Sequence, residues 1–241
     1  EQCLVSRPQT YGPARRSPDA MADQSGLSDT FYGRWAGLYD LFATAPWIRD
    51  WRDRAVADLA LSPGDTVVEM GCGTGANFPH VRERIGPEGT LVGVDLVPAM
   101  LGQARDRIDA RGWQNVHVVR GDATRPPLDG VDTILATFVV GMLPDPAAAV
   151  RTWVRSVAPG GRLALLNVVR TDRLPARPLN LACRAFVRAS APGYRTRLAS
   201  PTRALERRWQ SATEALFEGT VAHTDERFGG GFLALAGGQC L

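Results

Sequence analysis

Short strand-like stretches that alternate with helical patterns constrain the fold of this chain most strongly. The stretch TVVEMG, which begins at Thr66, is rich in β-branched residues and precedes a glycine-containing turn and a helical pattern. This order recurs, so we expect further strands at Thr90–Leu96, Asn115–Asp122, Val131–Val140 and, after a turn at Pro159–Gly161, over residues 162–169. Helices are expected at Asn77–Ile85, at Pro98–Arg111 and from near Asp145. Strands and helices that alternate through short turns form a parallel sheet with helices on both faces, so the sequence predicts an α/β fold.

The two ends of the chain depart from this alternation. A helical pattern with regularly spaced aromatic residues covers residues 31–46, where a proline ends it, and a second helix is expected over residues 47–61. Near the C-terminus we expect two last strands, over residues 215–226 and 229–238. The chain therefore adds helices before the alternating part and a pair of strands after it.

Length and composition fit one large domain behind a polar segment. The 241 residues, 44% of them hydrophobic, are enough for a sizeable core, and no run of about 18 apolar residues is present. Residues 1–20 contain proline, show no periodicity and lack the apolar core of a signal peptide. We expect residues 1–28 to be a disordered extension and residues 29–241 to form the domain.

The four cysteines stand far apart, without any C-x-x-C pair, at Cys3, Cys72, Cys183 and Cys240. This spacing fits neither a zinc site nor a disulfide framework, so no metal site is predicted. A reducing compartment is the simplest setting for such cysteines, and we expect a cytoplasmic protein.

Positive charge is concentrated near the C-terminal end of the chain. All 28 basic residues are arginines, so no lysine is present to form a Schiff base or act as a general base. Ten of these arginines fall between residues 170 and 210, where only two acids, Asp172 and Glu206, accompany them. An asymmetry of this kind concerns the partners of a protein rather than its fold.

A glycine-rich loop comes after the first strand of the alternating part. Gly71 and Gly73 can adopt positive φ angles and allow a ligand to approach the backbone closely. The letters GCGTGA also satisfy G-x-G-x-x-[GA], so a dinucleotide-binding fold is an alternative. Glu69, however, lies two residues before the loop and would repel a pyrophosphate. A ligand with both an ammonium and a carboxylate would satisfy this acid and the amides at the start of the next helix.

Two further acids end the next two strands. Asp95 can accept two hydrogen bonds from a ribose diol, which suits a dinucleotide as well. Asp122 ends the third strand, where it could meet the exocyclic amine of adenine. An amino acid, a ribose and an adenine together describe S-adenosylmethionine (SAM).

Four motifs occur in order: E-x-G-x-G-x-G at Glu69–Gly75, GVD at Gly93–Asp95, GDA at Gly121–Ala123 and PGG at Pro159–Gly161. On these motifs the chain resembles class I SAM-dependent methyltransferases, over about residues 31–169. The resemblance implies a Rossmann-like, seven-stranded mixed sheet with helices on both faces and an antiparallel last strand. Within this class, RWAGLYD at 34–40 and FVVGMLPDPAAAV at 138–150 resemble phospholipid N-methyltransferases and the menaquinone/ubiquinone C-methyltransferase group.

The resemblance also implies which residues bind the cofactor: Tyr32, Tyr39, Glu69, Gly71, Cys72, Gly73, Gly75, Asp95, Leu96, Asp122, Ala123 and Thr137. The acid in the first strand would hold the methionine amine, and the glycine loop would surround the methionine and the ribose. The acid after the second strand would bind the ribose hydroxyls, and the GDA turn the adenine edge. Thr137 and Phe138 would lie near the sulfonium. One of the two tyrosines would close over the cofactor, although both could instead be core aromatics on one helix face.

We expect methyl transfer to a small or amphiphilic acceptor, such as a quinone precursor, a lipid headgroup or a related metabolite. The alternatives are an NAD-type oxidoreductase and a SAM-binding module without catalysis. No catalytic residue is assigned, because a general base is needed only if the acceptor atom must lose a proton. We expect His117 to pack in or beside the sheet, and His80 and His223 to be surface residues.

The residues after the fourth strand narrow the substrate class. The letters GMLPDP differ from the Asn/Asp-Pro-Pro-aromatic pattern of nucleic-acid amino-methylating enzymes, and the Pro-Cys pair of cytosine C5 methylation is missing. We therefore expect no nucleic-acid partner. In this fold a substrate lid often precedes the sixth strand, so residues 170–210 are interpreted as a basic helical lid. Arg177, Arg184 and Arg188 could contact an anionic membrane surface or an acidic substrate, or form a solvated face.

Overall fold

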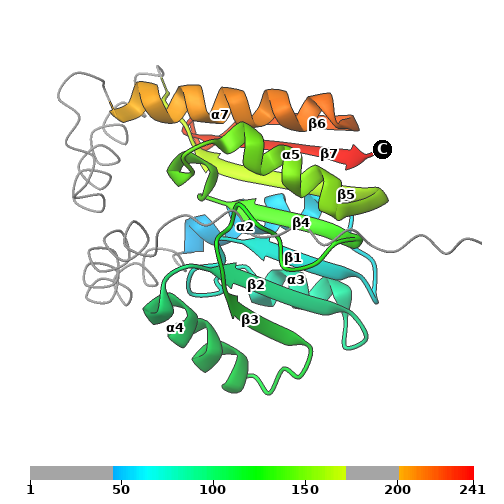
Figure 1. The fold of residues 1–241 in the computed structure, drawn as a ribbon. Coiled ribbons are helices and arrows are strands. Elements are labelled where there is room, and N and C mark those ends of the chain that lie inside the picture. The colour runs from blue at the N-terminus through cyan, green and yellow to red at the C-terminus, as the bar shows by residue number, and fades with distance from the viewer. Residues whose placement is uncertain (1–45, 172–200) are drawn as a thin grey trace, which may run out of the picture.

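The computed structural model describes residues 46–171 and 201–241, which form one seven-stranded sheet covered by helices (Figure 1). The strands lie in the order β3-β2-β1-β4-β5-β7-β6. Strands β1 to β5 pair parallel with one another, whereas β7 pairs antiparallel with both β5 and β6. The predicted mixed sheet with an antiparallel last strand is confirmed. The strands are β1 Thr66–Met70, β2 Thr90–Asp95, β3 Val116–Arg120, β4 Val131–Thr137, β5 Val157–Val168, β6 Thr220–Phe228 and β7 Leu233–Cys240.

The chain changes direction across the sheet at β1. From β1 it runs outward through β2 to the edge strand β3, and then returns to the other side of β1 as β4. The connections after β1 and β4 therefore leave in opposite directions at the carboxyl ends of neighbouring strands. In open α/β sheets this switch point is where ligands bind.

Helices cover both faces of the sheet, as predicted (Figure 1). Successive strand residues point to opposite faces, so Val67 and Leu91 join one buried cluster and Val68 and Val92 join the other. Helices α2, α3 and α4 pack on the first cluster, and α5 and α7 on the second. The helices are α2 Pro46–Asp58, α3 Phe78–Ile85, α4 Pro98–Asp109, α5 Pro146–Ser156 and α7 Pro201–Glu218, with a 3₁₀ turn η1 at Val140–Met142.

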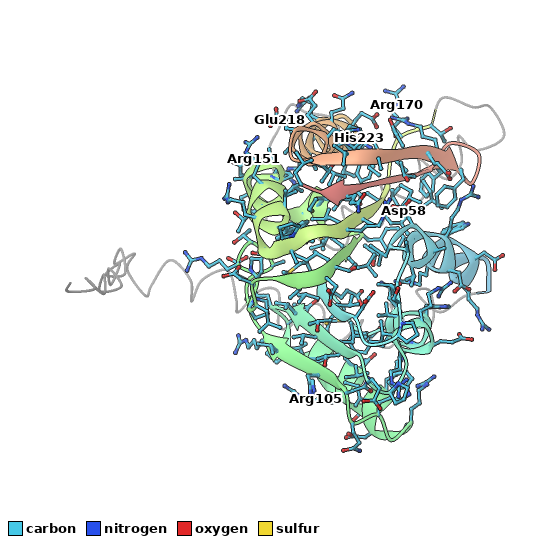
Figure 2. The ribbon with its side chains drawn as sticks, turned by 90° about the vertical axis from the view of Figure 1, so that its right-hand side faces the viewer. Asp58, Arg105, Arg151, Arg170, Glu218 and His223 are labelled. Atoms are coloured by element: carbon cyan, nitrogen blue, oxygen red, sulfur yellow. The ribbon has the colours of Figure 1, made fainter. Side chains whose placement is uncertain are left out.

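Two tryptophans help to fill the core between the sheet and helices α5 and α7. Trp153 of α5 is fully buried and Trp209 of α7 nearly so. At the surface the two helices are joined by an ion pair between Arg151 and Glu218, with 3.4 Å between nitrogen and oxygen (Figure 2). In the part of the chain that the structure describes, no helix is long and apolar enough to cross a membrane.

Four predicted boundaries are wrong. The last strand begins at Leu233 rather than at residue 229, because residues 229–232 form a turn with positive φ at its three glycines. Strand β4 ends at Thr137 rather than Val140, because Phe138 has a φ of 60° and the 3₁₀ turn comes next. Residues 215–218 belong to α7 rather than to a strand, since Ala215 and Leu216 continue the buried helical stripe of that helix. Residues 159–161 lie within β5, where the pairing with β4 is irregular, instead of forming a separate turn before it.

Several predictions fall on residues outside the described part. These are the extension over residues 1–28, the aromatic helix over residues 31–45 with Tyr32 and Tyr39, and residues 172–200 of the interpreted lid. They stay predictions from the sequence.

Candidate cofactor site

The glycine loop between β1 and α3 has the backbone that its sequence predicts. Gly71, Gly73 and Gly75 have φ angles of 69°, 55° and 72°, in the left-handed region that side chains with a Cβ rarely adopt. A Cβ on Gly71 would also lie 2.6 Å from the Cγ2 of Val139. The loop is thus both tightly turned and closely packed.

Cys72 contributes to this loop through its backbone. Its N–H donates to the carbonyl of Val94 over 3.0 Å, and its side chain is 5% exposed. Burial raises the pKa of the thiol well above its ordinary value, so the sulfur stays protonated and packs among core residues. A contact between Cys72 and a ligand would therefore come from the backbone rather than from the thiol.

Glu69, in β1, is a buried acid with one unused oxygen. The side chain is 1% exposed, and its Oε1 accepts a hydrogen bond of 2.6 Å from the Nδ2 of Asn77. Its Oε2 has no hydrogen-bond partner among the described residues. Burial is the main cause that raises the pKa of Glu69 to about 7. A cationic donor that reaches Oε2 would satisfy this oxygen and favour the ionised form.

Asp95 lies at the end of β2 and faces the glycine loop. Its Oδ2 accepts from the backbone N–H of Gly73 and its Oδ1 from that of Val97, each over 2.9 Å. Burial raises the pKa of the carboxyl, while these two hydrogen bonds oppose the shift. Each oxygen keeps a further lone pair, with which the carboxylate can accept from a diol. Leu96, the next residue, is 50% exposed beside it.

Asp122 and Ala123 form a turn just after β3. The Oδ1 of Asp122 accepts from the backbone N–H of Thr124 over 2.9 Å, and the carbonyl of Ala123 accepts from the indole N–H of Trp153 over 2.7 Å. The backbone N–H of Gly121 donates to the carbonyl of Asp95, so the turn lies beside the end of β2. Asp122 is exposed, as an acid that meets a ligand edge must be.

Thr137 and Phe138 end β4 on the other side of β1. Thr137 is 6% exposed, and its hydroxyl oxygen accepts from the Nδ2 of Asn77 over 2.9 Å. Phe138 has its left-handed backbone at this point, and its N–H donates to the carbonyl of Leu166. The structure therefore places all the predicted site residues that it describes at the carboxyl ends of neighbouring strands.

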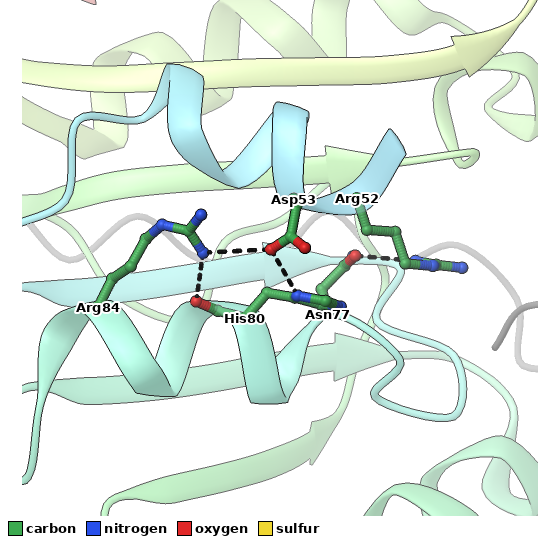
Figure 3. A network of polar contacts seen from close by, with 5 residues as sticks. All are labelled: Arg52, Asp53, Asn77, His80 and Arg84. Atoms are coloured by element: carbon green, nitrogen blue, oxygen red, sulfur yellow. Dashed lines mark hydrogen bonds and ion pairs between the residues drawn. The ribbon is translucent and has the colours of Figure 1, made fainter. Parts of the chain in front are cut away.

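Sequence reasoning missed two buried polar residues that join these ends. Asn77 is fully buried between Glu69 and Thr137, and its Oδ1 accepts from the Nη1 of Arg52 over 2.9 Å (Figure 3). Arg52 comes from α2 and is itself 5% exposed. Asn77 stands directly after the glycine loop, which was a usable signal. Arg52 sits in a helix with many charged residues, and nothing in its sequence distinguishes it.

Two of the three histidines differ from their predicted places. His80 is buried rather than a surface residue, because its Nδ1 lies 2.7 Å from the Oδ1 of Asp53 and joins α3 to α2 (Figure 3). Burial lowers the pKa of His80, although Asp53 opposes the shift. His117 is exposed rather than packed, since β3 is the edge strand. His223 is exposed, as predicted, and its ring stacks on Phe217.

Comparison with known proteins agrees with this geometry. Residues 68–163 match the family model described as a methyltransferase domain. Nocamycin O-methyltransferase from Saccharothrix syringae is 31% identical over 164 residues, which cover 67% of this chain and 58% of that protein. Phosphatidylethanolamine N-methyltransferase from Cereibacter sphaeroides is 29% identical over 158 residues, covering 64% and 74%. A solved SAM-dependent methyltransferase from Aquifex aeolicus superposes with a TM-score of 0.58 at 16% identity, covering 94% of this chain and 100% of that one.

The family match over residues 68–163 and the fold agree with the resemblance to SAM-dependent methyltransferases that the motifs predicted. The chain spans 31% to 58% of the length of the first curated relatives that it matches. The cofactor of this class is SAM, and the site fits it on its own geometry. The glycine loop, the carboxylate of Asp95 and the Oε2 of Glu69, which has no partner among the described residues, match an amino acid joined to a ribose.

Proposed function

We propose that this chain transfers a methyl group from SAM to a small or amphiphilic acceptor. The observation that carries this proposal is the buried Oε2 of Glu69, which has no partner among the described residues and lies beside a loop of left-handed glycines. A buried acceptor without a partner costs about 1–3 kcal/mol. The ammonium of a methionine moiety would remove this cost.

Each candidate site residue would bind a different part of SAM. Glu69 would accept from the amino group, the glycine loop would lie along the methionine and ribose, and Asp95 would accept from the ribose hydroxyls. Asp122 and Ala123 would meet the adenine edge, and Thr137 would lie near the sulfonium. When bound, SAM supplies a methyl group on a good leaving group. The protein's part is then to align the acceptor and to exclude water.

An NAD-type oxidoreductase fits this site less well. A dinucleotide would bring its pyrophosphate to the amides after the glycine loop, close to the acid at Glu69. Burial keeps the pKa of Glu69 near 7, so about half of the molecules would carry a negative charge there at neutral pH. The repulsion and the unsatisfied oxygen both argue against this ligand.

The surface beside the end of β4 supports an acceptor with both an apolar and a polar part. Met142, in the turn after this strand, is 58% exposed among the described residues, and the Nη1 of Arg208 donates to the carbonyl of the neighbouring Gly141 over 2.7 Å. An apolar side chain and a guanidinium close together suit an acceptor with an apolar body and a polar or anionic group. Similar proteins are named for phosphatidylethanolamine, demethylmenaquinone and aklanonic acid. The arginines of segment 170–210 would help to hold a membrane-presented acceptor.

Transfer of labelled methyl groups tests the proposal. The purified chain would be incubated with methyl-labelled SAM and, separately, with a demethylated naphthoquinol, phosphatidylethanolamine vesicles and an aromatic polyketide acid. Label that appears in one acceptor and is lost in the Asp95→Ala variant supports methyl transfer. Tight cofactor binding without transfer to any member of a broad acceptor panel would instead favour a SAM-binding module without catalysis.

A further inference from the structure

We infer that Asn77 and Arg52 are positioning residues of the cofactor site, which fix one oxygen of Glu69 so that its other oxygen is presented to the amino group of the ligand. The identity of that ligand rests on the proposed function. The hydrogen-bond chain itself is a property of the folded protein.

Every polar atom of the Asn77 carboxamide is used. Its Oδ1 accepts from Arg52 over 2.9 Å, and its two N–H groups serve Glu69 Oε1 at 2.6 Å and Thr137 Oγ1 at 2.9 Å. The four side chains come from α2, from the start of α3, from β1 and from the end of β4. A fully buried and fully paired amide has one orientation, so it holds Glu69 and Thr137 in a fixed relation.

Asn77 makes these contacts instead of the capping hydrogen bond that is usual at its position. It is the N-cap residue of α3, a position where an Asn side chain commonly accepts from the first backbone N–H groups of the helix. Here the side chain makes no capping hydrogen bond. A residue whose only purpose was to start α3 would use its oxygen for the helix. The oxygen instead accepts from Arg52, and the nitrogen is turned toward the site.

The contact with Asn77 determines what Glu69 offers to a ligand. A short hydrogen bond at Oε1 restricts rotation of the carboxylate, and Oε2 is left buried and unpartnered among the described residues. Because the donor is neutral, the negative charge of Glu69 is not cancelled by an ion pair at this contact. The carboxylate is therefore held ready for a cation, and it need not break an existing ion pair to receive it.

Arg52 connects this arrangement to α2. Its guanidinium donates to Asn77 and also lies 5.5 Å from the ring centroid of Phe138, in the connection after β4. One side chain of α2 thus contacts both connections that leave the switch point of the sheet. Its charge also lowers the pKa of Glu69, opposing the effect of burial. Together these contacts make the presentation of Glu69 depend on the position of α2.

The test compares two ligands in a variant that removes the donor but keeps the shape. In Asn77→Asp, an oxygen replaces the nitrogen that serves Glu69 and Thr137, while the side chain keeps its size and the oxygen that accepts from Arg52. Titration calorimetry would measure S-adenosylhomocysteine, which has the amino acid group, and 5′-methylthioadenosine, which lacks it. We expect the affinity for the first to fall at least tenfold and that for the second to change less than about threefold.

Two further variants complete the test. Arg52→Met removes the guanidinium at similar volume, and we expect a smaller loss in the same direction, again confined to the ligand with the amino acid group. Asn115→Asp alters an equally bonded asparagine at the opposite end of the sheet, beside Gly86 and Arg82, and should leave both affinities unchanged. Arg52→Met also keeps the test decisive if Asn77→Asp fails to fold.

The outcomes separate this inference from the proposed function. If the unaltered protein binds neither ligand, the proposed function is wrong and the inference with it. Suppose that the unaltered protein binds both ligands. If the Asn77→Asp and Arg52→Met variants keep both affinities, or lose affinity for both ligands by the same factor, the proposed function stands. The residues would then be merely structural, and the inference would be wrong.

Discussion

The carboxylate of Asp95 accepts a hydrogen bond from the backbone N–H of Gly73, with 2.9 Å between oxygen and nitrogen. This contact ties the end of β2 to the middle of the glycine loop after β1. In the proposed function the same carboxylate would accept from a ribose diol. One side chain would therefore both shape the loop and meet the ligand, so its removal would affect binding in two ways.

Replacing Asp95 tests its role at the ribose. We expect Asp95→Ala to weaken binding of S-adenosylhomocysteine at least tenfold, about 1.4 kcal/mol, because the diol loses its acceptor and the loop loses a support. Titration calorimetry measures the change. Asp106→Ala, which removes an exposed acid from α4, is the control and should bind normally. Unchanged affinity in Asp95→Ala would rule out this assignment.

Gly71 and Gly64 form a matched pair for the loop backbone. Both have positive φ, but a Cβ on Gly71 would meet Val139 at 2.6 Å, whereas a Cβ on Gly64 would meet nothing within 4 Å. Gly64→Ala therefore introduces backbone strain alone, whereas Gly71→Ala introduces both backbone strain and overpacking against Val139. We expect the second variant to lose about 1–3 kcal/mol more of the free energy of unfolding, measured by urea denaturation. Equal losses would mean that Val139 moves aside freely.

The raised pKa of Glu69 predicts a pH dependence of binding. An ammonium at Oε2 would lower this pKa from about 7, so the complex would hold fewer protons than the free protein. Affinity for S-adenosylhomocysteine should therefore rise with pH, by up to about tenfold per unit below about pH 7, and level off above it. The charged groups around Glu69 are Arg52, Arg107 and Asp95.

A second ligand separates the effect of Glu69 on the pH dependence from that of Asp95, because burial also raises the pKa of Asp95. Both S-adenosylhomocysteine and 5′-methylthioadenosine carry the diol that Asp95 would bind, but only the first carries the amino group. The ratio of their affinities should follow the titration of Glu69, and Glu69→Gln should remove the pH dependence of the ratio. A ratio that stays constant between about pH 5.5 and 8 would contradict the contact with the amino group.

The basic segment gives a prediction that comes from the sequence alone, since Arg184 and Arg188 lie outside the described residues. Replacing both by glutamine should reduce methyl transfer to a vesicle-bound or anionic acceptor several-fold and leave S-adenosylhomocysteine affinity unchanged. The same replacement at Arg105 and Arg155, which are exposed on α4 and α5, changes the net charge equally and serves as the control. Equal transfer in both double variants would assign the segment to a solvated face.

The sequence was sufficient for the elements and for the strand ends at which most candidate site residues lie, because these depend on local patterns. Buried strands, glycines at fixed spacing and acids at strand ends all appear as short motifs between Thr66 and Ala123. The end of β4 was misplaced because Phe138 is an aromatic residue in a left-handed conformation, which tertiary contacts impose. The burial of His80 was missed because its partner Asp53 lies 27 residues away.

The contacts of Asn77 could not be predicted for a similar reason. Its partners Glu69, Arg52 and Thr137 stand 8, 25 and 60 residues away, and only the folded sheet brings them together. An asparagine after a glycine loop is an ordinary start to a helix. Its hydrogen bonds, rather than its position, distinguish it.

Calorimetric titration of the purified protein with S-adenosylhomocysteine, with NADH in parallel, tests most directly whether this site holds a methyl-donor cofactor. We expect binding of S-adenosylhomocysteine in the micromolar range, about −8 kcal/mol, and no heat of binding with NADH. Binding of NADH without S-adenosylhomocysteine would contradict the proposed function. It would mean that the glycine loop is a dinucleotide turn and that Glu69 has another partner.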